Sequence, residues 1–180
     1  FFIIGPDEKK ELPNVIRALR FVDLRRGPVA LLVKKNTFET YSQLNNATTN
    51  SSLLNREEAI KCLIEISPKG SFYVSTTGMA SRELYEIRDI NKDSHSFDFL
   101  TVGSMGHSSS IALGIAKAKR KKRIICLDGD GAAIMHLGSM AIIGTQESEN
   151  LVHIILNNGS HDSVGGQPSV AKEISLTSIA

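Results

Sequence analysis

Two kinds of hydrophobic pattern alternate along the chain. Short, mostly apolar runs that predict buried strands lie at residues 29–33, 72–76, 124–127 and 151–156. Stretches with apolar residues every three or four positions, which predict helices, lie at residues 12–24, 56–65, 81–89, 108–119 and 132–145. Buried strands that alternate with helices are typical of a parallel sheet with helices on both faces. The pattern therefore predicts an α/β fold.

One stretch interrupts this alternation. In residues 36–55, 12 of 20 residues are Ser, Thr or Asn, which indicates a polar linker. We therefore expect a domain over residues 56–180, preceded by residues 1–35 as the closing helix and strand of an earlier domain. The chain does not begin with Met and ends soon after the last predicted strand. We expect a piece of a longer protein, with the second domain cut short.

The composition is that of a globular domain, with 41% hydrophobic and 22% charged residues. No apolar run approaches the roughly 18 residues of a membrane helix, and the first residues show no basic signal-peptide region. We expect a cytoplasmic protein without a membrane partner. Two cysteines, Cys62 and Cys126, fit no metal or redox spacing and are expected to be reduced thiols.

Positive charge is concentrated in one segment. The net charge is only +2, yet six of the seven residues at 117–123 are Lys or Arg. Nucleic-acid binding usually needs basic residues spread over a face, together with aromatic residues, and the chain has no Trp. We interpret the segment as the solvated, cationic last turn of a helix, not as a nucleic-acid site.

Two junctions that follow predicted strands carry the candidate chemistry. The sequence Leu-Asp-Gly-Asp-Gly stands at 127–131, and Leu-Asn-Asn-Gly-Ser stands at 156–160. Twenty-five residues separate Gly-Asp-Gly from Asn-Asn. A helix of ~14 residues is about 21 Å long and a six-residue strand about 20 Å, so the chain returns to the same edge of the sheet. Asp130 and Asn158 are therefore expected to be neighbours.

A carboxylate, an amide oxygen and a backbone carbonyl together form a hard-oxygen set that suits Mg²⁺ or Ca²⁺. Gly129 and Gly131 allow the backbone to approach a phosphate closely, and a helix N-terminus favours the anion. The alternative is that Gly-Asp-Gly is a plain tight turn and Asn-Asn-Gly an ordinary loop. The spacing of the two motifs favours a joint cation and diphosphate site.

This pair of motifs resembles the signature of thiamine-diphosphate-dependent enzymes. The resemblance covers roughly residues 56–170, which look like the diphosphate-binding domain, while residues 1–35 look like the end of a pyrimidine-binding domain. Within that group, the chain is most similar to the phosphonopyruvate decarboxylases. The segments that carry this similarity lie at residues 75–85, 103–107 and 158–168.

The resemblance implies a Mg²⁺ ion held by the Asp130 carboxylate, the Asn158 side chain and the Ser160 carbonyl. It also implies a set of residues that bind thiamine diphosphate. That set is Gly78, Ser81, Gly103, Met105, Gly129, Gly131, Ala132 and Asn158.

Individual roles follow from the same resemblance. The Gly103 carbonyl would accept a hydrogen bond from the cofactor's amino group, Met105 would hold the cofactor bent, and the main-chain N–H groups of Gly131 and Ala132 would meet the diphosphate. Ser81 has a plain helix cap as its alternative role. His161 is the candidate catalytic residue, because it is the one titratable ring in the loop after the metal motif. His107 is a further candidate to lie near the cofactor, and the other histidines, His95, His136 and His153, are interpreted as structural.

The implied reaction is decarboxylation of 3-phosphonopyruvate to phosphonoacetaldehyde and CO₂ in phosphonate biosynthesis. In such enzymes a Glu of the pyrimidine-binding domain activates the cofactor, so this chain alone should be inactive, and at least a dimer is implied. Alternatives are a sulfopyruvate decarboxylase subunit, another thiamine-diphosphate enzyme such as an acetolactate synthase, and a binding domain without turnover. A nicotinamide dehydrogenase is disfavoured because Ile134 stands where its fingerprint needs Gly.

Overall fold

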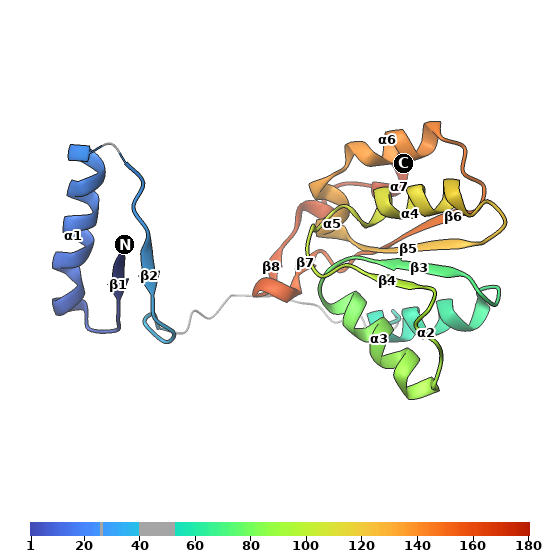
Figure 1. The fold of residues 1–180 in the computed structure, drawn as a ribbon, viewed down its shortest axis with the longest axis horizontal. Helices are drawn as coiled ribbons and strands as arrows, with labels where there is room; N and C mark the ends of the chain where they lie inside the picture. Colours follow the sequence, from blue (N-terminus) through green and yellow to red (C-terminus); the bar gives the residue numbers. More distant parts are fainter. Residues whose placement is uncertain (26, 40–52) are drawn as a thin grey trace. The chain divides into compact units, whose positions relative to one another are not determined.

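The computed structural model describes residues 1–25, 27–39 and 53–180. The chain forms two compact units, Phe1–Ala47 and Thr48–Ala180, and each is described by itself (Figure 1). Residues 40–52, which make up most of the predicted linker, lie outside the described residues.

The first unit holds two strands and one helix. Strand β1 (Phe2–Ile4) pairs in parallel with β2 (Leu31–Val33), and α1 (Glu8–Arg25) connects them. The predicted helix is confirmed and begins four residues earlier than expected. The prediction of a buried strand at 29–33 is wrong in two respects, because β2 is shorter and its side chains are exposed in this unit. Strand β1 was not predicted.

The second unit is built on a parallel sheet of four strands in the order β4-β3-β5-β6. The strands are β3 (Phe72–Ser75), β4 (Asp98–Leu100), β5 (Ile124–Gly129) and β6 (Leu151–Leu156). The predicted parallel α/β fold is confirmed. Strand β4 was missed because it is a short edge strand with only two apolar residues. Strand β5 is longer than predicted, because its pairing with β6 continues to Gly129.

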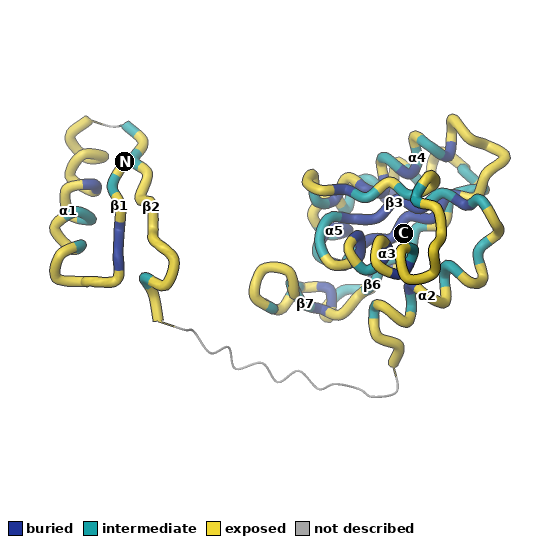
Figure 2. The backbone as a smooth tube through the Cα atoms, turned by 60° about the horizontal axis from the view of Figure 1, so that its bottom comes forward, coloured by how far each residue is buried: buried dark blue, intermediate teal, exposed yellow. Residues whose placement is uncertain are grey.

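Helices cover both faces of this sheet. Helices α2 (Arg56–Ile66) and α3 (Met79–Asn91) lie on one face, and α4 (Ser108–Ala118) and α6 (Gly138–Thr145) on the other (Figure 1). The buried residues gather in the sheet between these helices (Figure 2). On the α2 and α3 face the core contains large side chains, among them Ile60, Leu84 and Leu127. On the α4 face it contains smaller ones, Ala112, Ala116 and Cys126.

The single helix predicted at 132–145 is wrong. The chain forms two shorter helices, α5 (Asp130–Met135) and α6, with a break at His136. His136 leaves the helical conformation at φ −128° and ψ 46°. Its ring packs against that of His107 with 4.2 Å between centroids, so a side-chain contact across the turn accompanies the break.

After β6 the chain folds back toward the ends of the strands. Residues Ser160–His161 (β7) and Gln167–Pro168 (β8) form a small antiparallel pair around the 3₁₀ turn η1 (Asp162–Val164). A second 3₁₀ turn, η2 (Val170–Lys172), and a last helix, α7 (Leu176–Ile179), follow. Both β7 and η2 contact α5, so this segment borders the junction that carries Gly-Asp-Gly. Within the described part of the chain, no helix has the length and apolar character to cross a bilayer.

Helix α3 offers a matched test of the core, because Ile87 is 2% exposed and Ile90 is 76% exposed. We expect Ile87→Ala to lower the free energy of unfolding by about 2–5 kcal/mol, since it removes buried methyl groups and leaves a cavity. Ile90→Ala should change it by no more than about 0.5 kcal/mol. Urea unfolding of both variants is the measurement, and equal losses would contradict the assigned orientation of α3.

Candidate functional site at the carboxyl ends of the strands

A cleft of about 540 Å³ opens at the end of the sheet where β5 and β6 finish. Residues from both strand ends, from α2 and α3, and from the segment after β6 line it. Eight of the predicted site residues border this one cleft. They are Met105, Gly129, Asp130, Gly131, Ala132, Asn158, Ser160 and His161.

Asp130 stands where β5 ends and α5 begins. It is only 3% exposed, and its carboxylate accepts a hydrogen bond from the Ser169 hydroxyl. In the described residues, no ion pair compensates its charge. Burying an ionised carboxylate without a cationic partner costs free energy of folding, unless a further polar or cationic group reaches it.

Asn158 is held by a tight local network. Its Oδ1 accepts a hydrogen bond from the Ser160 N–H at 3.0 Å, and its Nδ2 donates to Asp162 Oδ2 at 2.6 Å. The preceding Asn157 repeats the pattern by accepting from the Gly159 N–H at 3.0 Å. Gly159 has φ +66°, a conformation that favours glycine. The Asn-Asn-Gly motif therefore builds a fixed loop that borders the same cleft as Asp130.

An ion-pair network that the sequence did not reveal crosses one wall of the cleft. Arg56 donates from Nε and Nη2 to the two carboxylate oxygens of Glu83, both at 2.8 Å, and its Nη1 lies 3.7 Å from Asp162 Oδ2. The hydrogen bond to Glu83 is the main reason that the pKa of Arg56 is raised. The network joins α2 and α3 to the loop that carries Asn158. No sequence signal pointed to it, because these residues come from separate elements.

Gly131 and His161 lie against each other. A Cβ atom at position 131 would stand 2.5 Å from His161 Cε1, 2.7 Å from its Nδ1 and 3.6 Å from Met105 Cε. Only a glycine leaves room for this arrangement. The ring predicted to be catalytic is thus brought next to the Gly-Asp-Gly turn and close to Met105.

Within the described structure, three of the predicted site residues do not line the cleft, namely Gly78, Ser81 and Gly103. The Ser81 hydroxyl donates to the Ser75 and Thr76 carbonyls, at 3.2 and 2.6 Å, and is buried. Its alternative role as a helix cap is wrong, because the cap position of α3 is Gly78, with φ +104°. No atom of the described residues, apart from its chain neighbours, lies within 4 Å of a Cβ placed on Gly103.

The remaining histidines lie in separate surroundings. The ring of His107 contacts that of His136 at a tilt of 53°, and within the described structure His107 does not line the cleft. His95 stacks on Tyr85 with 4.3 Å between ring centroids. His153 Nε2 lies 3.2 Å from Asp128 Oδ2, in the interior of the sheet.

Sequence comparison with known proteins identifies the family to which this chain belongs. Residues 76–179 match the family model described as thiamine pyrophosphate enzyme, C-terminal TPP binding domain. A phosphonopyruvate decarboxylase of Streptomyces viridochromogenes is 40% identical over 125 residues, which cover 69% of this chain and 30% of that protein. The β subunit of sulfopyruvate decarboxylase from Methanocaldococcus jannaschii is 35% identical over 126 residues, which cover 69% of this chain and 64% of that subunit.

A more distant relative is the large subunit of acetolactate synthase from Buchnera aphidicola, 27% identical over 158 residues that cover 86% of this chain and 26% of that protein. The chain thus spans less than a third of the phosphonopyruvate decarboxylase that it matches. The family match covers more than half of the chain and includes both strand-end motifs. The chain therefore belongs to the thiamine pyrophosphate enzyme family, and residues 76–179 are its C-terminal cofactor-binding domain.

Proposed function

We propose that the protein containing this chain is a Mg²⁺-dependent thiamine-diphosphate decarboxylase that converts 3-phosphonopyruvate to phosphonoacetaldehyde and CO₂. The observation that carries the proposal is the common cleft bordered by Asp130 and Asn158 at the ends of adjacent strands. The similarity to phosphonopyruvate decarboxylases supports the substrate.

The donor set in the cleft fits Mg²⁺. The Asp130 carboxylate is buried without a cationic partner in the described structure, and the Asn158 amide oxygen and the Ser160 carbonyl supply further hard oxygens. Mg²⁺ prefers oxygen ligands and commonly binds through one or two carboxylates together with phosphate oxygens. A cation here would also offset the cost of burying the Asp130 charge.

The cleft also fits a phosphorylated cofactor. Its volume of about 540 Å³ lies within the usual range for cofactor sites. The main-chain N–H groups of Gly131 and Ala132 are proposed to meet the diphosphate, with Gly129 leaving space beside them. Met105 is proposed to contact the rings. Thiamine diphosphate, when bound, supplies the electron sink that loss of CO₂ from a 2-oxo acid requires.

The chain's own side chains would bind and orient the acid. His161 stands beside Gly131 and lines the cleft, so its ring can donate a hydrogen bond or a proton to a bound 2-oxo acid. Arg56 also lines the cleft, but its guanidinium is paired with Glu83 and Asp162, so this cluster brings no net positive charge to the site. The roles of Gly78, Ser81 and Gly103 stay predictions, since these residues stand outside the described lining.

A sulfopyruvate decarboxylase is the second candidate. The chain covers nearly two thirds of sulfopyruvate decarboxylase β subunits, which are separate polypeptides. On either proposal, a pyrimidine-binding domain of the same or another chain would complete the site, in an assembly of at least two such chains.

Product analysis distinguishes the two substrates. We expect the full-length protein, given Mg²⁺ and thiamine diphosphate, to release CO₂ and phosphonoacetaldehyde from phosphonopyruvate. Turnover of sulfopyruvate alone would reject the first substrate in favour of the second. Failure with both acids, in a preparation that binds the cofactor, would reject the decarboxylase assignment.

Cofactor binding tests the metal ligands apart from turnover. Because a ligand that binds only the folded state stabilises it, Mg²⁺ and thiamine diphosphate at a hundredfold excess over Kd should add about 2.7 kcal/mol and raise the Tm. Asp130→Asn should remove the Mg²⁺-dependent part of this shift. Asp89→Asn, which changes an exposed carboxylate of α3, should keep it. Equal shifts in both variants would argue against Asp130 as a ligand.

The contact between Gly131 and His161 gives a further test on the protein alone. Gly131→Ala places a methyl group where the His161 ring lies, so the ring must move. We expect the His161 imidazole signals in a ¹H–¹⁵N spectrum to shift, while the fold persists because a side chain gives way. Gly129→Ala is the matched control, since a Cβ there meets no atom of the described part of the chain within 4 Å. Unchanged His161 signals in Gly131→Ala would contradict the contact.

A further inference from the structure

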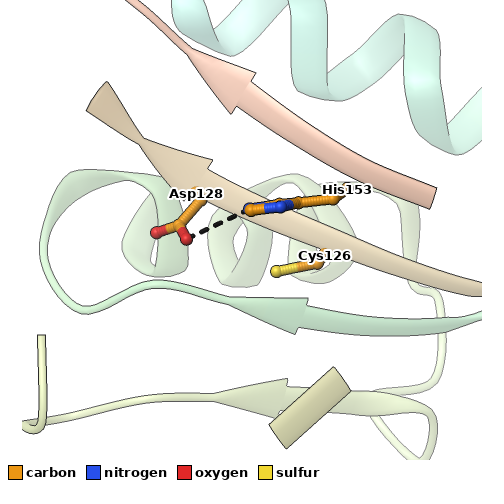
Figure 3. A group of neighbouring side chains, drawn as sticks. All are labelled: Cys126, Asp128 and His153. Carbon is orange, nitrogen blue, oxygen red and sulfur yellow. Dashed lines mark hydrogen bonds and ion pairs between the residues drawn. The ribbon is translucent and has the colours of Figure 1, made fainter. Parts of the chain in front are cut away.

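A second group of possible metal ligands lies on the sheet itself, and one of its members, Asp128, also lines the cleft proposed to bind the cofactor. Cys126 and Asp128 alternate along β5 with Ile125 and Leu127, so they point to the face covered by α4. His153 pairs in register with Cys126 on the neighbouring strand β6 and therefore points to the same face. Figure 3 shows the three side chains drawn together from the two strands.

The geometry of this group suits a single ion. One ligand atom of each residue, the Cys126 thiol sulfur, a carboxylate oxygen of Asp128 and a ring nitrogen of His153, lies within 4.8 Å of the other two. His153 Nε2 and Asp128 Oδ2 are 3.2 Å apart. Cys126 and Asp128 are 0% exposed, while the His153 side chain is 15% exposed and leaves a route from solvent.

One buried polar atom of the group lacks a partner in the described structure. It is Asp128 Oδ1, the second oxygen of the carboxylate that His153 contacts. The Ser108 hydroxyl, at the start of α4, lies beside Cys126 and interacts with its thiol. A carboxylate oxygen of a fully buried residue is rarely left unpaired, so Asp128 Oδ1 indicates a missing polar or ionic occupant.

We propose that Cys126, Asp128 and His153 bind one divalent transition-metal ion of the zinc class. A thiolate, an imidazole and a carboxylate are the ligand types that Zn²⁺ takes in proteins, usually with four ligands. Water or the Ser108 hydroxyl completes the set. The thiolate distinguishes this site from the all-oxygen set around Asp130, which suits Mg²⁺. The ion would join β5 to β6 two residues before Asp130, and the proposal does not depend on the decarboxylase assignment.

Metal binding at this site exchanges a proton. Burial raises the pKa of the Cys126 thiol, and the nearby Asp128 carboxylate raises it further, so without metal the sulfur carries its proton. The charged or titratable groups that face it are Asp128 on β5 and His153 on β6, while α4 and β3 contribute the uncharged side chains of Ser108, Ala112 and Val74. The ion takes the place of the thiol proton, which leaves to solvent, and no electron is transferred.

Titration of the reduced, full-length protein with Co²⁺ tests the proposal. Co²⁺ bound to a thiolate produces an intense sulfur-to-metal charge-transfer absorption, whereas Co²⁺ bound only to oxygen does not. We expect this absorption to saturate at one equivalent, with release of about one proton per ion. Zn²⁺ should displace the signal and Mg²⁺ should not.

Variants locate the site. Cys126→Ser should abolish the absorption, and Cys62→Ser, which changes the exposed cysteine of α2, should keep it. His153→Ala should weaken Co²⁺ binding at least ~10-fold, since even removal of an outer-shell partner has that effect. Asp130→Asn should leave the absorption unchanged, so loss of the Mg²⁺ site and loss of this site are told apart.

A measurement on the unmodified protein covers the case in which Cys126→Ser does not fold. X-ray absorption of the Zn²⁺-loaded protein should show one sulfur ligand at about 2.3 Å. Absence of sulfur from the Zn²⁺ shell, absence of the Co²⁺ absorption in the reduced wild type, or the same absorption in folded Cys126→Ser would each overturn the proposal.

Discussion

The register of β5 against β6 is the constraint on which the rest of this domain depends. The two strands stay paired until Gly129 meets Leu156, so both end at the same level. Asp130 follows one strand by one residue and Asn158 follows the other by two. A shift of one residue would turn every side chain of a strand to the opposite face, so the register is fixed by the packing of both faces. The candidate metal ligands are thereby positioned by the backbone ladder of the sheet.

The two faces of the sheet are packed differently. Large aliphatic side chains such as Ile60, Leu84 and Leu127 fill the face under α2 and α3 and supply most of the buried hydrophobic surface there. The other face meets α4 through Ala112 and Ala116, so the helix can lie close while polar side chains share the interior. Buried polar groups lie on both faces, since the ion pair of Arg88 with Asp98 borders Tyr73 on the first face and Asp128 lies on the second.

The sequence predicted the elements and motifs that depend on a local pattern of residues. It did not predict features that depend on contacts between residues far apart in the chain. Strands with continuous apolar runs and the pair of motifs at Asp130 and Asn158 could be found, because periodicity and spacing encode them. The break at His136 could not, since it accompanies a ring contact with His107 from another element. The pairing of Arg56 with Glu83 and the contact of His153, interpreted as structural, with Asp128 could not be predicted either. The partners lie 27 and 25 residues apart, and only the fold brings them together.

The small pair β7 and β8 has its own hydrogen-bond ladder, separate from the four-stranded sheet. It carries both Ser160 and His161 to the lining of the cleft, and Ser169, directly after β8, donates its hydroxyl to the Asp130 carboxylate. The hairpin therefore borders both the buried carboxylate at the end of β5 and the ring beside Gly131. A substitution that displaces the hairpin would disturb both positions at once.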